Sequence, residues 1–190
     1  MTDHRSAPGF ADERLDAHAW AADLIGLPWP ERLRRVREDR AFATPSFIEL
    51  SISLGRDVGL PASDRQRWAQ LAVEAAMRGP RRRAEELESL AWAVLGTAYR
   101  VRGRLSAGRT AFKRCHALRQ RMTNVLELAD TYSHEAAYWW EIAGWSLKGY
   151  RASRIGRDGQ MALTRGAEFI NEALRLATPT AVPQTSMKKA

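Results

Sequence analysis

The amino-acid sequence predicts an all-α protein in which antiparallel helix pairs stack into an array. Apolar residues recur every three or four positions through several successive segments, which is the spacing of amphipathic helices. Proline, glycine and capping residues separate these segments, as they do at helix ends. Gly103 and Gly108 have counterparts 41 residues later at Gly144 and Gly149, and recurrence at a fixed spacing is typical of repeats.

Composition indicates a globular chain of one domain. The 190 residues are 45% hydrophobic and 27% charged, which excludes a disordered or fibrous protein. The longest apolar run falls short of the roughly 18 residues that a membrane-spanning helix needs, so we expect no membrane association. The polar first residues lack the apolar core of a secretory signal, and we therefore expect a cytoplasmic protein.

The expected elements divide the chain into one domain at residues 11–177 and disordered tails at 1–10 and 178–190. They are amino-terminal helices at 11–40, helix pairs at about 44–79, 84–121 and 124–156, and a carboxy-terminal capping helix at 160–177. Residues 47–54 partly alternate between apolar and polar, as in a strand. Thr44 followed by Pro45 is the start signal of a helix, and it favours a helix there.

A segment at residues 90–115 resembles one tetratricopeptide repeat. The residues that match the pattern are Trp92, Leu95, Gly96 and Tyr99 on the first helix and Gly108, Phe112 and Cys115 on the second. The resemblance implies a right-handed superhelical array, with helices approaching closely at the glycines. The 41-residue spacing exceeds the 34 residues of the standard repeat, so extended helices and a related helical repeat are both open.

The same resemblance implies a concave groove lined by the non-core positions of the first helix. The matching positions are Leu90, Ala93, Thr97 and Arg100. They lack the Lys and Asn residues with which the family clamps a peptide carboxylate, so a chaperone's carboxy-terminal tail is not the expected ligand. The adjacent Trp139 and Trp140 point in directions about 100° apart on a helix, and we expect at least one to border the groove.

Positive charge is concentrated in the middle of the chain. Residues 63–125 contain 14 basic and 5 acidic residues, which accounts for the net charge of +8. A candidate basic patch follows the turn of the repeat-like segment and consists of Arg102, Arg104, Arg109 and Lys113. Such a patch suits an acidic protein segment or nucleic acid, but an ordinary solvated helix face is the favoured explanation.

Catalytic and metal-binding motifs are not evident in the sequence. His134 and Glu135 begin the string HEAAY, in which Tyr138 replaces the second His of the HExxH zinc signature. The single cysteine, Cys115, falls at a small core position, where a buried, unreactive thiol is expected. The sequence therefore predicts no catalytic residue, no metal and no cofactor, and a protein that is not an enzyme.

The function expected from these features is that of a non-catalytic scaffold or adaptor. It would bind a protein or peptide partner within a regulatory or multisubunit assembly. The alternative is a regulatory protein associated with nucleic acid through its Arg-rich face. The sequence does not predict whether the chain forms a homo-oligomer.

Overall fold

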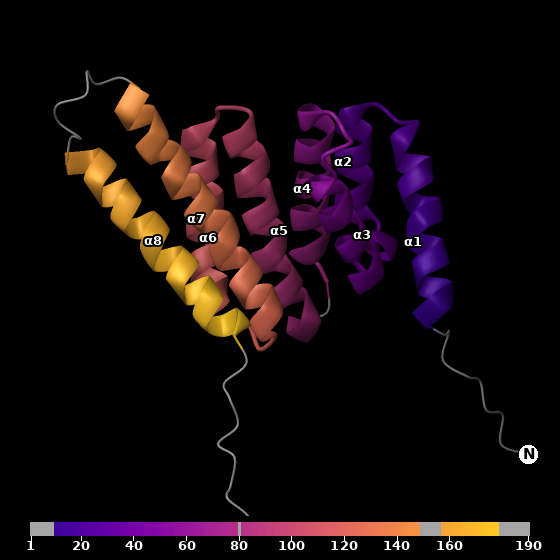
Figure 1. Ribbon diagram of the computed structural model, residues 1–190. Coiled ribbons are helices and arrows are strands. Elements are labelled where there is room, and N and C mark those ends of the chain that lie inside the picture. Colours follow the sequence, from indigo (N-terminus) through magenta and orange to yellow (C-terminus); the bar gives the residue numbers. More distant parts are fainter. Residues whose placement is uncertain (1–9, 80, 149–156, 179–190) are drawn as a thin grey trace, which may run out of the picture.

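The computed structural model describes residues 10–79, 81–148 and 157–178. These residues form eight α-helices and one short 3₁₀ helix, η1. In Figure 1, α1 lies at one end of the molecule and α8 at the other, with α5 between them. Their bounds are α1 Phe10–Ile25, α2 Trp29–Glu38, η1 Arg40–Ala43, α3 Pro45–Arg56, α4 Ala62–Ala76, α5 Arg81–Val101, α6 Leu105–Arg119, α7 Val125–Lys148 and α8 Arg157–Ala177. Among the described helices, none combines the length and the apolar character that a bilayer crossing requires.

Helix α3 begins at the capping signal that the sequence contains. The Thr44 hydroxyl accepts a hydrogen bond from the backbone N–H of Phe47 at 3.4 Å, and Pro45 is the first helical residue. A proline at this position loses no hydrogen bond, because the first N–H groups of a helix have no partner within it. Residues 47–54 are therefore helical, and the prediction of a helix there is confirmed.

Successive helices pack on one another through the array. Helix α3 packs on α4, α5 on α6 and α7 on α8, and α5 also contacts α3, α4 and α7. At the amino-terminal end, α1 lies against α3 and α2 against α4. The described residues thus confirm an all-α fold with sequential, antiparallel-like packing of helices.

Two apolar clusters fill the space between the helices. The larger extends from α1 to α5 and includes Phe47, whose side chain is completely buried. The smaller joins α5, α6 and α7 through Ala93, Phe112, Cys115 and Tyr138. Burial raises the pKa of the Cys115 thiol, which keeps it protonated and confirms its predicted core position.

Glycines allow α5 and α6 to approach closely, as the resemblance implied. A Cβ atom added to Gly96 would lie 2.8 Å from the ring of Phe112, and one added to Gly108 would lie 3.2 Å from the Gly96 carbonyl oxygen. Gly103 lies in the turn between these helices with a φ of 69°, which glycine adopts without the steric penalty of other residues. The predicted turn and the close contact of the two helices are both confirmed.

The last helix pair differs from the sequence prediction. Helix α7 continues through Gly144 to Lys148, so Gly144 lies within a helix and is not a turn residue like Gly103. The second helix expected within 124–156 overlaps the end of α7, and residues 149–156 lie outside the described ones. A helix, α8, is present where the capping helix at 160–177 was expected, and it packs along α7 with Gly166 against the Trp140 ring.

The tails expected at 1–10 and 178–190 lie almost entirely outside the described residues. Residues 1–9 and 179–190 lie outside the described residues. Phe10 already belongs to α1, and Thr178 donates a backbone hydrogen bond to the Leu174 carbonyl at 3.0 Å. Within the described residues, α1 begins one residue before the expected start of the domain, and α8 ends at Ala177.

Candidate partner-binding groove

The structure separates the four predicted groove residues into two groups. Leu90 and Ala93 are buried, with 6% and 0% exposure, because the faces of α5 that carry them pack against neighbouring helices. A partner cannot reach these two side chains, so they do not line a groove. Thr97 and Arg100 do line a hollow in the surface, with a volume of about 340 Å³.

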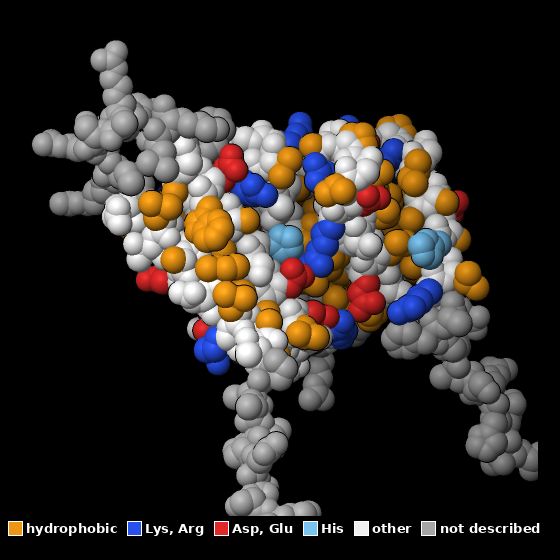
Figure 2. All heavy atoms as spheres, in the orientation of Figure 1, with side chains coloured by type: hydrophobic (Ala, Val, Ile, Leu, Met, Phe, Trp, Pro, Cys, Tyr) orange, Lys and Arg blue, Asp and Glu red, His pale blue; other side chains and the backbone are white. Residues whose placement is uncertain are grey.

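We call this hollow the central groove. Its lining comes from α3 to α5 and α7 and comprises Gly55, Arg56, Val58, Ala62, Arg65, Val94, Thr97, Ala98, Arg100, Val101 and His134. On the face shown in Figure 2, charged and histidine side chains gather near the middle of the molecule, with hydrophobic side chains on either side. A polar centre with apolar flanks suits a segment of polypeptide that carries both charged and apolar residues.

Three arginines give the central groove its charge. Arg56 Nη2 lies 2.5 Å from Asp130, and Arg100 Nη1 lies 3.3 Å from Glu141. The Arg65 side chain makes no hydrogen bond or ion pair within the described part of the chain, and its buried Nε atom has no acceptor there. The buried Nε of Arg100 also lacks an acceptor among the described residues. The guanidinium of Arg65 is therefore not paired with an acidic side chain in this part of the protein.

His134 lies in the central groove as a neutral side chain. Burial lowers its pKa to about 4, although Asp130, whose carboxylate is 3.6 Å from Nε2, acts in the opposite direction. Its Nδ1 lies 2.8 Å from the Thr97 hydroxyl. The adjacent Glu135 faces away from this site and pairs with Arg119 at 2.6 Å, so His134 and Glu135 do not form a joint site. Within the described ranges, no cluster of three or more His, Cys, Asp or Glu side chains has the arrangement of a metal site.

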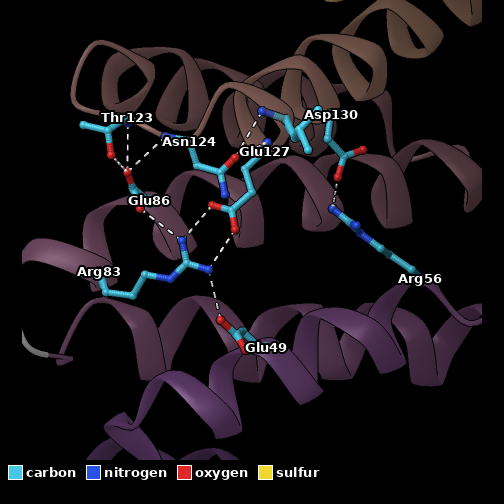
Figure 3. Close-up of polar contacts among 9 residues, drawn as sticks. Glu49, Arg56, Arg83, Glu86, Thr123, Asn124, Glu127 and Asp130 are labelled. Carbon is cyan, nitrogen blue, oxygen red and sulfur yellow. Dashed lines mark hydrogen bonds and ion pairs between the residues drawn. The ribbon is translucent and has the colours of Figure 1, made fainter. Parts of the chain in front are cut away.

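Beside the groove, Arg83 connects three helix pairs (Figure 3). Its guanidinium contacts Glu49 of α3 at 3.0 Å, Glu86 of α5 at 3.0 Å and Glu127 of α7 at 2.8 Å. Glu86 also accepts hydrogen bonds from the backbone N–H of Thr123 at 2.8 Å and from the Thr123 hydroxyl. These contacts fix the connection between α6 and α7 against the start of α5.

Glu86 makes the stability of the fold depend on pH. Its bonds to Thr123 and the nearby Arg83 lower the pKa of the carboxyl to about 2. The stabilisation is complete above the ordinary carboxyl pKa and is lost as the pH falls towards 2. We expect Glu86→Gln to lower the free energy of unfolding by about 2 kcal/mol at pH 7 and by much less at pH 3, in urea titrations followed by circular dichroism.

Glu38→Gln is the control for this experiment. Glu38 pairs with Arg34 on the surface of α2 and is 60% exposed, so its loss should change stability by less than about 1 kcal/mol at either pH. An equal loss for Glu86→Gln at pH 7 and pH 3 would contradict the proposed role of its charge.

The predicted basic patch is divided between two places. Arg102 and Arg104 lie at the turn between α5 and α6, where Arg102 donates to Gln66 at 2.6 Å and Arg104 lies over the Tyr99 ring at 5.2 Å. Arg109 and Lys113 lie further along α6 and line a different cavity, between α6, α7 and α8. The four residues therefore have two different surroundings, the α5–α6 turn and the opening between α6, α7 and α8.

The two adjacent tryptophans also lie away from the central groove. Trp139 lines the cavity between α6, α7 and α8, and Trp140 packs against Gly166 of α8 while remaining 51% exposed. Neither tryptophan lines the central groove, and both contact or face α8 on the other side of α7.

Comparisons with known proteins give no match, whether with models of protein families, with curated proteins or with solved structures.

Proposed function

We propose that the protein is a non-catalytic interaction module that binds an acidic segment of a partner protein in the central groove. The main support is Arg65, a charged side chain that lines the groove without a hydrogen bond or ion pair among the described residues. Carboxylates are the natural partners of a guanidinium, because its planar donors match their two oxygens. The segment would approach the Arg65 and Arg100 side chains, which both line the groove.

Apolar side chains at the rim of the groove support a partner that is not purely acidic. Val58 is 86% exposed and Val101 is 45% exposed, and both line the groove. Exposed aliphatic side chains beside a charged centre favour a segment in which acidic and apolar residues alternate. This composition also distinguishes the proposed partner from a nucleic acid, which offers phosphates and flat bases.

The arrangement of the helices fits a module of this kind. Stacked helix pairs leave an extended face on which successive first helices present side chains to a partner. The resemblance of residues 90–115 to a tetratricopeptide repeat and the contacts of α5 with α3 and α7 support a right-handed superhelical array as the finer description. A scaffold or adaptor in a cytoplasmic assembly is the role that we propose for it.

The test compares partners captured by the parent protein and by groove variants. We expect Arg65→Glu and Arg100→Glu to lose a partner that the parent captures after chemical cross-linking, with the cross-links joining the groove to an acidic segment. Reversing a close charge typically weakens binding by about tenfold or more. Arg114→Glu is the matched control, because Arg114 is exposed on α6 and does not line the groove.

Two outcomes would overturn the proposal. Identical partners for the parent and both groove variants, identified by mass spectrometry, would exclude the groove as the binding site. Retention of the parent on nucleic acid, with a steep loss of affinity as salt rises, would favour the alternative of a nucleic-acid-associated regulator.

A further inference from the structure

A second cavity lies on the other side of α7 from the central groove. It has a volume of about 440 Å³ and opens between α6, α7 and α8. We call it the α6–α8 cavity. This volume falls in the range of roughly 300 to 1,000 Å³ that small-molecule sites occupy. Neither the interaction module proposed above nor the central groove uses any of its lining residues.

Aromatic rings form much of the wall of the α6–α8 cavity. Phe112, Tyr138, Trp139 and Phe169 line it, and the ring centroids of Phe112 and Tyr138 are 5.0 Å apart. The Tyr138 hydroxyl donates a hydrogen bond to the carbonyl of Leu105 at 3.1 Å, so its ring is held in place. Flat, fixed walls of this kind favour a flat ligand that can stack or pack edge-on against them.

One donor in this wall is left without an acceptor. The indole Nε1 of Trp139 is buried and finds no hydrogen-bond partner among the described residues. An indole N–H can only donate, so the group that would satisfy it must carry an acceptor atom. The indole of Trp139 thus belongs to the cavity wall and has an N–H group that no described residue accepts, which makes its NMR signal a sensitive reporter of changes there.

The charge of the α6–α8 cavity is positive. Arg109 and Lys113 project from α6 and Arg165 from α8, and the Arg165 guanidinium lies 4.9 Å from the Trp139 ring. Two carboxylates oppose them, from Glu135 and Glu168. Glu135 forms an ion pair with Arg119 at 2.6 Å, and Arg119 does not line the cavity. The other charged residues of the lining are Arg109, Lys113 and Arg165, which are cationic, and Glu168, which is acidic.

We propose that the α6–α8 cavity binds a small aromatic carboxylate. The aromatic body would lie against Trp139 and Phe169, the two rings of the wall that keep exposed surface. Its carboxylate would face Lys113 and Arg165. The flat ring matches the aromatic wall, and the negative charge matches the cationic side chains around the opening.

The test uses 2-naphthoate as the probe and the Trp139 indole signal as the readout. The seven indole N–H signals of the ¹⁵N-labelled full-length chain are recorded by NMR, and Trp139→Phe identifies the one from Trp139. We expect 2-naphthoate to shift this signal in a saturable manner. We expect Lys113→Gln and Arg165→Gln each to weaken binding by about tenfold.

Matched controls separate this site from general apolar binding. Arg114→Gln, an exposed change on α6 outside the cavity, should bind the probe as the parent does. The neutral amide of the same ring should bind more weakly than the carboxylate, and the corresponding ammonium compound should not bind. Arg65→Glu should leave the affinity for 2-naphthoate unchanged, so this test does not depend on the central groove.

Three results would overturn the inference. The first is a Trp139 signal that stays in place at millimolar 2-naphthoate. The second is equal affinity for the neutral or cationic analogue. The third is a loss of affinity in Arg114→Gln as large as that in Lys113→Gln, with all variants shown by circular dichroism to be folded.

Discussion

Replacing Arg119 with alanine is expected to lower the free energy of unfolding by about 3 to 5 kcal/mol. Arg119 and Glu135 form a buried ion pair with an N–O distance of 2.6 Å, and their side chains are only 3% and 9% exposed. The guanidinium also donates to the hydroxyl and carbonyl of Thr131, at 3.0 and 2.8 Å, and lies 4.1 Å from the Tyr132 ring. Removing it leaves the Glu135 carboxylate buried without its counter-charge.

The measurement is urea unfolding at neutral pH, with Arg175→Ala as the control. Arg175 pairs with Glu172 at 2.7 Å on the surface of α8, where its side chain is 67% exposed, so its loss should cost less than about 1 kcal/mol. The double variant Arg119→Met, Glu135→Leu should recover much of the stability, because it leaves no charge unpaired. A cost for Arg119→Ala no larger than that for Arg175→Ala would contradict this interpretation.

Gly96→Leu is expected to destabilise the fold by about 1 to 3 kcal/mol or more. The added Cβ alone would lie 2.8 Å from Phe112, and this ring has little room to move because it is 2% exposed and packs on Tyr138. The clash would force α5 and α6 apart along the contact that both helices share. Thermal unfolding followed by circular dichroism measures the effect.

Gly144→Ala is the matched control for the glycine contact. Gly144 also lies within a helix, and a Cβ added there would meet no atom within 4 Å. The change should therefore stabilise the protein by up to about 1 kcal/mol, because alanine favours helix more than glycine does. If Gly96→Leu melted at the temperature of the parent, the close approach of α5 and α6 would not be a determinant of stability.

Local signals in the sequence predicted most of the helices. The apolar spacing, the cap at Thr44 and the turn at Gly103 depend on residues close together in the chain, and the structure agrees with each. The last helix pair was predicted less well. The spacing between Gly103 and Gly144 suggested a second turn, whereas the apolar pattern of α7 continues through Gly144 into the same helix.

The candidate groove was predicted only in part, because burial depends on helices that are distant in sequence. Of the four residues that the repeat pattern assigned to a groove, Thr97 and Arg100 line the hollow, whereas neighbouring helices cover Leu90 and Ala93. Arg65 carries no sequence signal that distinguishes it from the many other arginines. Only the packing of α4 against α5 brings it into the groove.

The Arg83 contacts were not predictable from spacing in the sequence. Its three carboxylate partners come from α3, α5 and α7, and two of them are more than 30 residues away in the chain. From the sequence, Glu86 belonged to a charged first turn that favours the start of a helix. The structure shows it 8% exposed, with its carboxylate committed to Thr123 and Arg83.

The position of Arg83 also bears on how the chain unfolds. In a simple array each helix pair interacts only with its immediate neighbours, so the ends can fray while the middle persists. Arg83 joins Glu49 and Glu127, which belong to pairs that are not adjacent in the series, and Arg56 with Asp130 makes a second connection between the same helices. Both sets of contacts link α3 directly to α7, so we expect unfolding of α7 to remove contacts of α3 as well as those of its immediate neighbours.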